Sequence, residues 1–397
     1  MRTPLPRSLA DTLPVPEGAA LAHTHACADM LRAEITRAHG WLSFARFMEL
    51  ALYGPGLGYY AAGARKFGAD GDFVTAPEIS ALFGQTLAFS IADVLRQTGG
   101  DVLELGPGSG KLAREILLAL DEIGVLPARY RLLEVSADLR ERQQQALSTL
   151  PSHLAARAGW LDALPEDFTG IIIANELLDV IPVHLVTWKS RQWLERGVAL
   201  SGDTFIWQEE PMTSPELLTA MTGIQQEYLN GSPPDDYLTE VAPAVSGLVA
   251  SLAQSLTQGA MLFIDYGFRG AEFYHPSRIT GTLMCHYRHY AHIDPFRYPG
   301  LQDITAHVDF TSVAHAGIEA GLEVAGYATQ AQFLLASGLT DLLAKADPGD
   351  TARYLPLTNQ VQRLVSPAEM GEFFKVIGFT RGKVAIPALA RARPLPV

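Results

Sequence analysis

Short apolar segments alternate with segments of helical pattern along much of this chain. The apolar segments lie at 101–105, 130–134, 170–174 and 260–265. Strands that are buried on both faces are continuously apolar, and parallel neighbours are joined by crossovers that are usually helical. The sequence therefore predicts an α/β fold in which helices cover both faces of a doubly wound parallel sheet.

The composition and charge of the chain argue against nucleic-acid binding and membrane insertion. The chain has 397 residues, 48% of them hydrophobic, and a net charge of −13. An acidic surface repels phosphate backbones, so we predict no nucleic-acid partner. No apolar run reaches the roughly 18 residues that span a bilayer, so we predict no membrane insertion. With only Cys27 and Cys285, and no apolar leader, we expect a reducing compartment. Asp11 and Glu17 disfavour an organellar transit peptide, so we expect the cytoplasm rather than a mitochondrial matrix.

The order of the segments predicts four regions. A β-meander at 184–207 and a helix at 215–229 interrupt the alternation, and strands at 322–327 and 374–379 are expected to extend the sheet. The regions are an N-terminal helical cover and cofactor lid (1–97), the first part of a Rossmann-like core (98–180), an inserted β-rich and helical lobe (181–258), and the second part of the core with substrate-side loops (259–397).

A glycine-rich loop follows the first strand and opens a helix. It reads Glu104-Leu105-Gly106-Pro107-Gly108-Ser109-Gly110. Glycine permits tight turns and close approach of a ligand, and the amides of a helix N-terminus face that ligand. In open α/β sheets, ligands bind at this end of the strands.

The loop has three possible interpretations: a site for a dinucleotide, a site for S-adenosylmethionine, or a tight turn that binds no ligand. A dinucleotide fingerprint needs Gly-x-Gly-x-x-Gly, but Lys111 occupies the position of its third glycine. The loop of S-adenosylmethionine (SAM) enzymes, an acid followed by alternate glycines, fits Glu104, Gly106, Gly108 and Gly110. We predict SAM as the cofactor, with Glu104 serving its ammonium group.

Two further acids follow strands and are candidates for contacts with the nucleoside. Glu134 ends the second strand, where a carboxylate can accept both ribose hydroxyls, in a dinucleotide site as well as in a SAM site. Asp162 can accept from the adenine amino group, or can instead cap the following helix.

Three polar residues interrupt the apolar stretch after the strand at 170–174, beside the expected cofactor pocket. They are Asn175, a cofactor-binding candidate, and the carboxylates Glu176 and Asp179. Burial of carboxylates costs several kcal/mol unless they are paired. A cationic substrate would pair with them, and polar contacts that shape the loop are the alternative.

Four strings together resemble the MidA family of SAM-dependent methyltransferases. They are 104–110, Asn175–Asp179 with Pro182–His184, Gly71–Phe73 with Thr75–Ser80, and Gln302–Phe310, and the resemblance spans about residues 31–382. It implies the class I SAM-dependent methyltransferase fold and methylation of a protein arginine. It further implies, as the protein partner, a homologue of a respiratory complex I (NADH dehydrogenase) subunit.

The resemblance also suggests how the acceptor is bound. Asn175-Glu176-Leu177-Leu178 is similar to the start of the acidic loop of protein arginine methyltransferases, whose second glutamate position is Leu185 here. A carboxylate that accepts two parallel hydrogen bonds from a guanidinium holds one of its nitrogens toward the methyl group. We assign this catalytic role to Glu176, with Asp179 in support.

Other residues of the same strings receive roles at the site. We expect Thr75 and Ser80 to close over SAM as part of a lid, with Glu78 on the substrate side, although Ser80 can also cap the next helix. Asp303 is a substrate-binding candidate. His307 is a catalytic candidate whose alternative is a structural hydrogen bond.

Several other functions stay open. The histidine-rich stretch 285–292 lacks the usual arrangement of thiolates or glutamate, so we predict no metal. The alternatives to arginine methylation are a small-molecule SAM-dependent methyltransferase, an assembly chaperone that binds SAM without turnover, and an NAD-dependent oxidoreductase. No oligomeric state is predicted.

Overall fold

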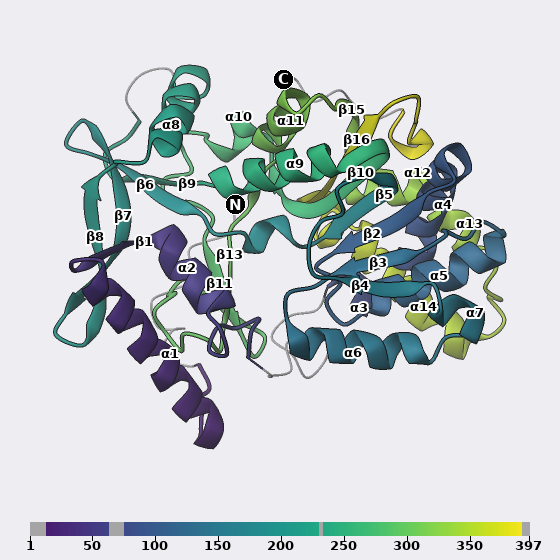
Figure 1. Cartoon of the computed structure of the whole chain (residues 1–397), viewed down its shortest axis with the longest axis horizontal. Helices are drawn as coiled ribbons and strands as arrows, with labels where there is room; N and C mark the ends of the chain where they lie inside the picture. The colour runs from purple at the N-terminus through teal and green to yellow at the C-terminus, as the bar shows by residue number, and fades with distance from the viewer. Residues whose placement is uncertain (1–12, 63–74, 230–232, 391–397) are drawn as a thin grey trace. The chain divides into compact units, whose positions relative to one another are not determined.

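The computed structural model describes residues 13–62, 75–229 and 233–390 (Figure 1). The chain forms two compact units, each assembled from separate segments. The first unit contains the described parts of Met1–Phe73, Asp179–Val245 and Gly270–His307, and the second contains those of Val74–Leu178, Ser246–Arg269 and Val308–Val397. The predicted region 1–97 is thus divided between the units.

The second unit is built on a mixed sheet with a parallel core. Its strand order is β15-β16-β10-β5-β2-β3-β4, and β14 pairs with the end of β10. β16 runs antiparallel to both of its neighbours, and the other pairs are parallel. The strands are β2 (Asp101–Leu105), β3 (Tyr130–Leu133), β4 (Ala158–Leu161), β5 (Phe168–Asn175), β10 (Leu256–Phe268), β14 (Val308–Asp309), β15 (Glu323–Thr329) and β16 (Phe374–Arg381).

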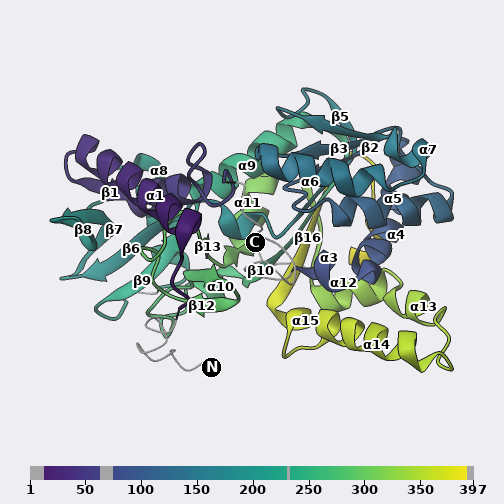
Figure 2. The same cartoon turned by 90° about the horizontal axis from the view of Figure 1, so that it is seen from below.

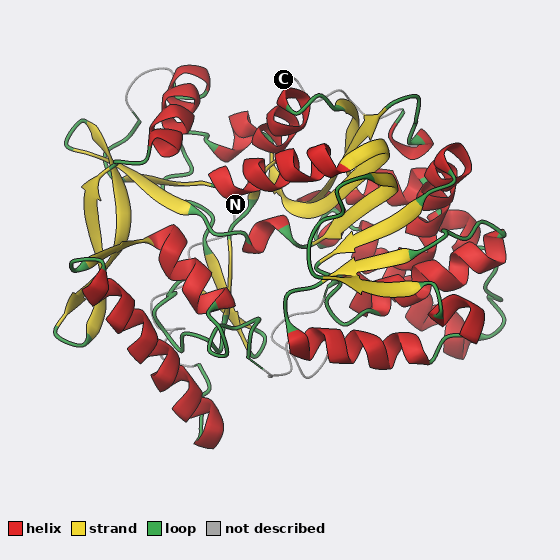
Figure 3. Ribbon diagram, in the orientation of Figure 1, coloured by secondary structure: helices red, strands yellow, loops and turns green. Residues whose placement is uncertain are grey.

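Helices pack against both faces of this sheet (Figures 2 and 3). Ile171 and Ile173 of β5 share a buried cluster with α4 and α5. On the opposite face α11 lies against β16, because a Cβ on Gly317 would come within 2.3 Å of a Phe379 ring carbon. The helices are α3 (Ala76–Ile79), α4 (Ala81–Thr98), α5 (Lys111–Ile123), α6 (Ala137–Ser148), α7 (Ser152–Ala155), α9 (Pro243–Ser255, which begins in the first unit), α11 (Phe310–Glu319), α12 (Gln330–Ala336), α13 (Leu339–Leu343), α14 (Thr351–Val365), α15 (Met370–Phe373) and the 3₁₀ turn η3 (Pro387–Leu389).

The predicted α/β fold and the extension of its sheet by the last two strands are therefore confirmed. The purely parallel pattern holds only for the core, since β16 enters antiparallel between β15 and β10. Its sequence is as apolar as that of a parallel strand because it is also buried on both faces.

The first unit contains two antiparallel sheets. Five strands pair in the order β1-β7-β6-β9 with β8 on β7, and three pair as β12-β11-β13. Phe44, Phe47, Leu185, Val198 and Ile304 belong to the core of this unit. Its elements are α1 (Gly18–Arg37), β1 (Trp41–Ser43), α2 (Phe44–Tyr53), η2 (Leu178–Val180, which begins in the second unit), β6 (His184–Lys189), β7 (Gln192–Ser201), β8 (Thr204–Pro211), α8 (Pro215–Glu227), β9 (Tyr237–Val241), α10 (Gly270–Phe273), β11 (Met284–Tyr287), β12 (Tyr290–His292) and β13 (Asp303–Thr305).

The histidine-rich stretch 285–292 of the first unit forms a β-hairpin. β11 and β12 pair antiparallel, and Arg288 and His289 have left-handed φ angles of 48° and 65°. Such angles at both central residues are typical of a two-residue hairpin turn. In the part of the chain that the structure describes, no group of three or more histidine, cysteine or acidic residues could hold a metal ion. No described helix is both long and apolar enough to cross a bilayer.

Three glycines allow the central strands to approach closely where they begin. A Cβ on Gly170 would lie 1.9 Å from the carbonyl oxygen of Asp101, and one on Gly259 would lie 1.8 Å from that of Gly170. A Cβ on Gly100 would lie 2.1 Å from the carbonyl oxygen of Thr169. The φ angle of Gly170, 137°, is also one that side chains rarely allow.

We therefore predict that Gly170→Ala lowers the free energy of unfolding by about 2–3 kcal/mol, because backbone rather than a flexible side chain must move. Urea denaturation followed by circular dichroism measures this loss. Gly159→Ala in β4 is the matched control, since no atom lies within 4 Å of its added Cβ. Equal stability of the two variants would contradict the steric argument.

Candidate functional site

The glycine loop joins the end of β2 to the start of α5 in the second unit. Gly106, Gly108 and Gly110 have φ angles of 57°, 52° and 79°, all in the left-handed region that favours glycine. A Cβ on Gly106 would lie 2.9 Å from Leu177 Cδ1, and one on Gly110 would lie 3.0 Å from Gln143 Cα. The loop is thus a tight backbone turn between the segment after β5 and helix α6.

Glu104 lies in β2, one residue before its end, and only 2% of it is exposed. The Tyr130 hydroxyl, on neighbouring β3, donates a hydrogen bond of 2.6 Å to Glu104 Oε2. Burial raises the pKa of Glu104 to about 7, with the negative charge of Glu134 adding to the rise and the Tyr130 hydrogen bond opposing it. Glu104 therefore changes charge near neutral pH. Sequence reasoning treated Tyr130 only as part of the strand at 130–134 and missed this contact.

Glu134 follows β3 and is 5% exposed. Its Oε1 accepts from the Ser136 amide at 2.8 Å, and its Oε2 accepts from Gln143 Nε2 at 3.0 Å. Between Glu134 and Ser136, Val135 is 83% exposed. The structure thus combines an oriented carboxylate with an exposed apolar side chain, which suits a ribose beside the face of a purine.

Asp162 lies outside this buried network. Its side chain is 91% exposed and forms an ion pair of 2.8 Å with Arg140 Nη1. Arg140 also donates to the carbonyl oxygens of Glu134 and Leu161, at 2.7 and 2.8 Å. Asp162 thus follows β4 as predicted, and its contact with adenine stays a prediction.

The segment after β5 is held by buried polar contacts. Glu176 has a left-handed φ of 53°, and its amide donates to the carbonyl oxygen of Ile264 at 2.8 Å. Asp265 of β10, which is fully buried, accepts from the amides of Leu177 and Leu178 at 3.1 and 2.8 Å. Sequence reasoning treated Asp265 only as part of a strand, although an acid that ends an apolar strand was a usable signal.

The carboxylate of Glu176 is oriented by two donors. Its Oε1 accepts from the Ala76 amide at 3.2 Å and from Asn175 Nδ2 at 3.1 Å. Ala76 begins α3, which follows the predicted lid segment. The structure therefore brings Asn175, Glu176 and α3 together at the carboxyl end of β5.

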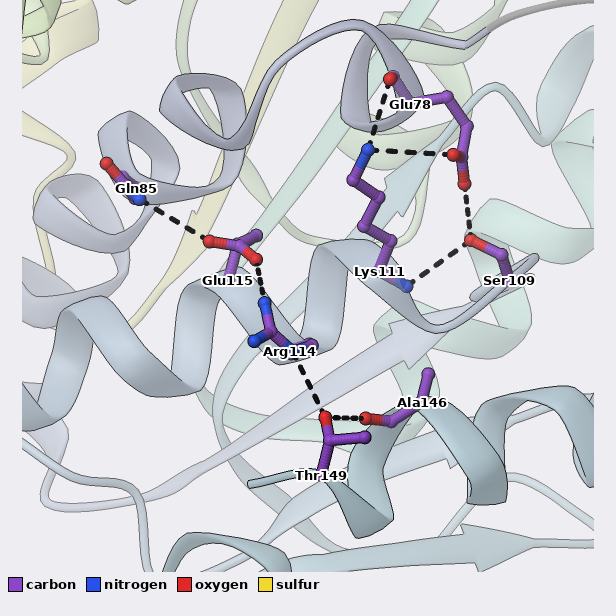
Figure 4. A network of polar contacts seen from close by, with 8 residues as sticks. All are labelled: Glu78, Gln85, Ser109, Lys111, Arg114, Glu115, Ala146 and Thr149. Carbon is purple, nitrogen blue, oxygen red and sulfur yellow. Dashed lines mark hydrogen bonds and ion pairs between the residues drawn. The ribbon is translucent and has the colours of Figure 1, made fainter. Parts of the chain in front are cut away.

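Helix α3 is also attached to the glycine loop (Figure 4). Ser109 Oγ donates to Glu78 Oε1 at 2.5 Å, and Lys111 Nζ donates to the Glu78 carbonyl oxygen at 3.1 Å. Glu78, predicted on the substrate side, thus contacts the loop in this structure.

The structure also describes the ends of the predicted lid. Ser80 accepts from the Leu82 amide at 3.3 Å and so caps α4, which is the alternative given for it above. Thr75 is the N-cap residue of α3, without a side-chain hydrogen bond to that helix. Residues 71–74 of the lid segment lie outside the described residues. The contacts of Thr75 and Ser80 with SAM stay predictions.

The remaining candidates belong to the first unit. Asp303 and Asp179 are 2% and 5% exposed, and the Tyr60 hydroxyl donates to Asp303 Oδ1 at 3.0 Å. Burial, with the charges of both carboxylates, raises the pKa of Tyr60 well above its usual value. The Tyr53 ring stacks on that of Tyr60 at 5.5 Å. Sequence reasoning missed these two tyrosines.

His307 also lies in the first unit, where its backbone amide donates to the Thr282 hydroxyl at 3.1 Å.

Comparison with known proteins identifies the cofactor. A family model for S-adenosyl-L-methionine-dependent methyltransferases (Methyltransf_28) matches residues 86–328. A protein from Burkholderia thailandensis, crystallised with S-adenosyl-homocysteine, is 48% identical, with a TM-score of 0.91 over 96% of this chain and 98% of that one.

Curated relatives match most of the chain as well. The zebrafish (Danio rerio) protein arginine methyltransferase NDUFAF7, mitochondrial, is 30% identical over 87% of this chain and 85% of its own. The Drosophila melanogaster NDUFAF7 homolog is 28% identical over 90% of this chain and 85% of its own.

The residues fit the cofactor that these comparisons indicate. Three residues of the loop are glycines with left-handed φ angles, and two buried acids, Glu104 and Glu134, lie at the ends of the adjacent strands β2 and β3. The predicted cofactor, SAM, is therefore confirmed. The assignment of single residues to its parts stays a prediction.

We predict that Tyr130→Phe weakens binding of S-adenosyl-homocysteine near pH 7 by about three- to tenfold. Without the donor the pKa of Glu104 rises above about 7, and the neutral acid attracts the ligand's ammonium group less. The deficit should shrink at about pH 8.5, where Glu104 ionises in both proteins. Calorimetric titration at the two pH values measures this, with Tyr290→Phe, on an exposed tyrosine, as the control. A deficit independent of pH would contradict the role given to Glu104.

Proposed function

This chain belongs to the MidA/NDUFAF7 family of SAM-dependent methyltransferases, and from that premise we propose that it methylates an arginine side chain of a protein. Relatives that carry the name protein arginine methyltransferase match most of its length. The proposal names the acceptor, whereas family membership gives the cofactor and the type of reaction.

The proposal depends on one observation, the position of the Glu176 segment beside the glycine loop. β5 and β2 are parallel neighbours in which Ala174 lies opposite Leu105. Directly beyond this pair, Leu177 lies so close to Gly106 that a Cβ there would be 2.9 Å from Leu177 Cδ1. Glu176 therefore follows β5 at the edge of the sheet where we predict that the cofactor binds.

A carboxylate at this position suits the chemistry of a guanidinium acceptor. Bound SAM supplies an electrophilic methyl group on its sulfonium. A guanidinium is almost always protonated, and its lone pair is delocalised, so the protein must orient one nitrogen and stabilise the charge on the others. The two donors to Glu176 Oε1 fix the plane of its carboxylate before the acceptor arrives. We assign to Glu176 the orientation of the acceptor's guanidinium.

The other assignments belong to the same proposal. Asp179 supports the acceptor, Asp303 binds substrate and His307 assists catalysis, and all three are described in the first unit. We propose a homologue of an NADH dehydrogenase subunit as the protein acceptor, as the family resemblance implies. The proposed setting is the cytoplasm, and both cysteines are buried and free of disulfides, as a reducing compartment favours.

A lysate experiment tests the acceptor. Purified protein is incubated with methyl-labelled SAM and an extract of cells that lack its gene, and proteins are then hydrolysed to amino acids. We expect label in methylarginine. Label confined to small molecules would favour a small-molecule methyltransferase, and no transfer at all would favour an assembly chaperone, so either result contradicts the proposal.

We predict that Glu176→Gln reduces methyl transfer by about a hundredfold or more, because the negative charge that orients the guanidinium is lost. Affinity for S-adenosyl-homocysteine should stay within about threefold of wild type, since glutamine keeps an oxygen that accepts from Ala76 and Asn175. Radiometric transfer and calorimetry give the two values. Glu141→Gln, on an exposed position of α6, is the control. Full turnover in Glu176→Gln would refute its assignment.

A further inference from the structure

We propose that Gln143 of helix α6 is a positioning residue for SAM binding, which holds the glycine loop and Glu134 in the geometry that the cofactor requires. Gln143 is fully buried, unlike its exposed neighbours Gln144 and Gln145. Its function would be exerted through other residues, without contact with the ligand. The inference concerns the cofactor and is independent of the acceptor proposed above.

The side-chain amide of Gln143 joins three separate elements of the second unit. Its Nε2 donates to the Gly108 carbonyl oxygen and to Glu134 Oε2, both at 3.0 Å. Its Oε1 accepts from the Trp160 indole nitrogen of β4 at 2.8 Å. One planar group therefore bonds to the glycine loop, to the acid after β3 and to β4.

The tryptophan fixes which way the amide faces. An indole N–H can only donate, so the oxygen of Gln143 must face Trp160 and its NH₂ group must face the other two partners. Both of those partners are acceptors, and an NH₂ group has two hydrogens to donate. The three contacts are thus mutually consistent and admit a single orientation of the amide.

Burial makes these contacts costly to lose. Glu134 is 5% exposed, and loss of a hydrogen bond to a buried carboxylate oxygen costs free energy that water cannot restore there. Helix α6 also lies directly against the loop, because a Cβ on Gly110 would be 3.0 Å from Gln143 Cα. Removal of the amide would therefore take one donor from the Gly108 carbonyl oxygen and one from Glu134 Oε2, while the Ser136 amide still donates to Oε1.

The test is calorimetric titration of the full chain with S-adenosyl-homocysteine, which needs no methyl acceptor. We expect Gln143→Leu to weaken binding by about tenfold or more, as loss of a hydrogen bond to a charged group predicts. Gln144→Leu, the same change at an exposed position of α6, should leave affinity unchanged. Thermal unfolding of both variants establishes that they fold.

A second variant separates positioning from general destabilisation. In Gln143→Glu the new carboxylate repels Glu134 when ionised and can donate a hydrogen bond when protonated. Relative to wild type at the same pH, its affinity deficit should be larger at about pH 8.5 than at about pH 6. Loss of stability alone would not produce this pH dependence.

A double-variant cycle tests whether Gln143 acts through Glu134. If it does, Gln143→Leu should weaken binding much less in a Glu134→Gln background than in wild type. Should Gln143→Leu fail to fold, Trp160→Phe removes the indole N–H that orients the amide and keeps an aromatic ring at that position, and we expect a smaller loss of affinity in the same direction. Wild-type affinity in folded Gln143→Leu and Gln143→Glu, or fully additive effects in the cycle, would overturn the proposal.

Discussion

The left-handed turn of the glycine loop is the constraint on which the rest of the site depends. Only residues without a Cβ adopt its φ angles readily and let Leu177 and helix α6 approach so closely. This approach places the segment after β5 and the side chain of Gln143 directly against the loop. The glycine loop and the segment that carries Glu176 are therefore packed as one structure.

The buried acids around this turn are each matched with particular donors. Glu104 accepts from Tyr130, Glu134 from Ser136 and Gln143, and Asp265 from two amides of the loop that follows Glu176. Burial disfavours a charge, and hydrogen-bond donors oppose this effect. The charge of Glu104, whose pKa burial raises to about 7, therefore depends on the hydrogen bond from Tyr130.

The sequence predicted the parallel core and the glycine loop because both leave local patterns, apolar runs of strand length and closely spaced glycines. Gln143 and Tyr130 left no such pattern, and the signal of Asp265, an acid at the end of an apolar run, was not used. Each is an ordinary polar residue whose importance arises from burial and from a partner distant in the chain. The antiparallel entry of β16 was likewise hidden, because a strand buried on both faces has the same composition in either direction.

The central claim is that this loop and its two strand-end acids bind SAM. Calorimetric titration of the purified chain with SAM and with NAD, under identical conditions, tests it most directly. The account predicts saturable binding of SAM at one site per chain and no binding of NAD. Saturable binding of NAD, or no heat of binding with SAM, would contradict it.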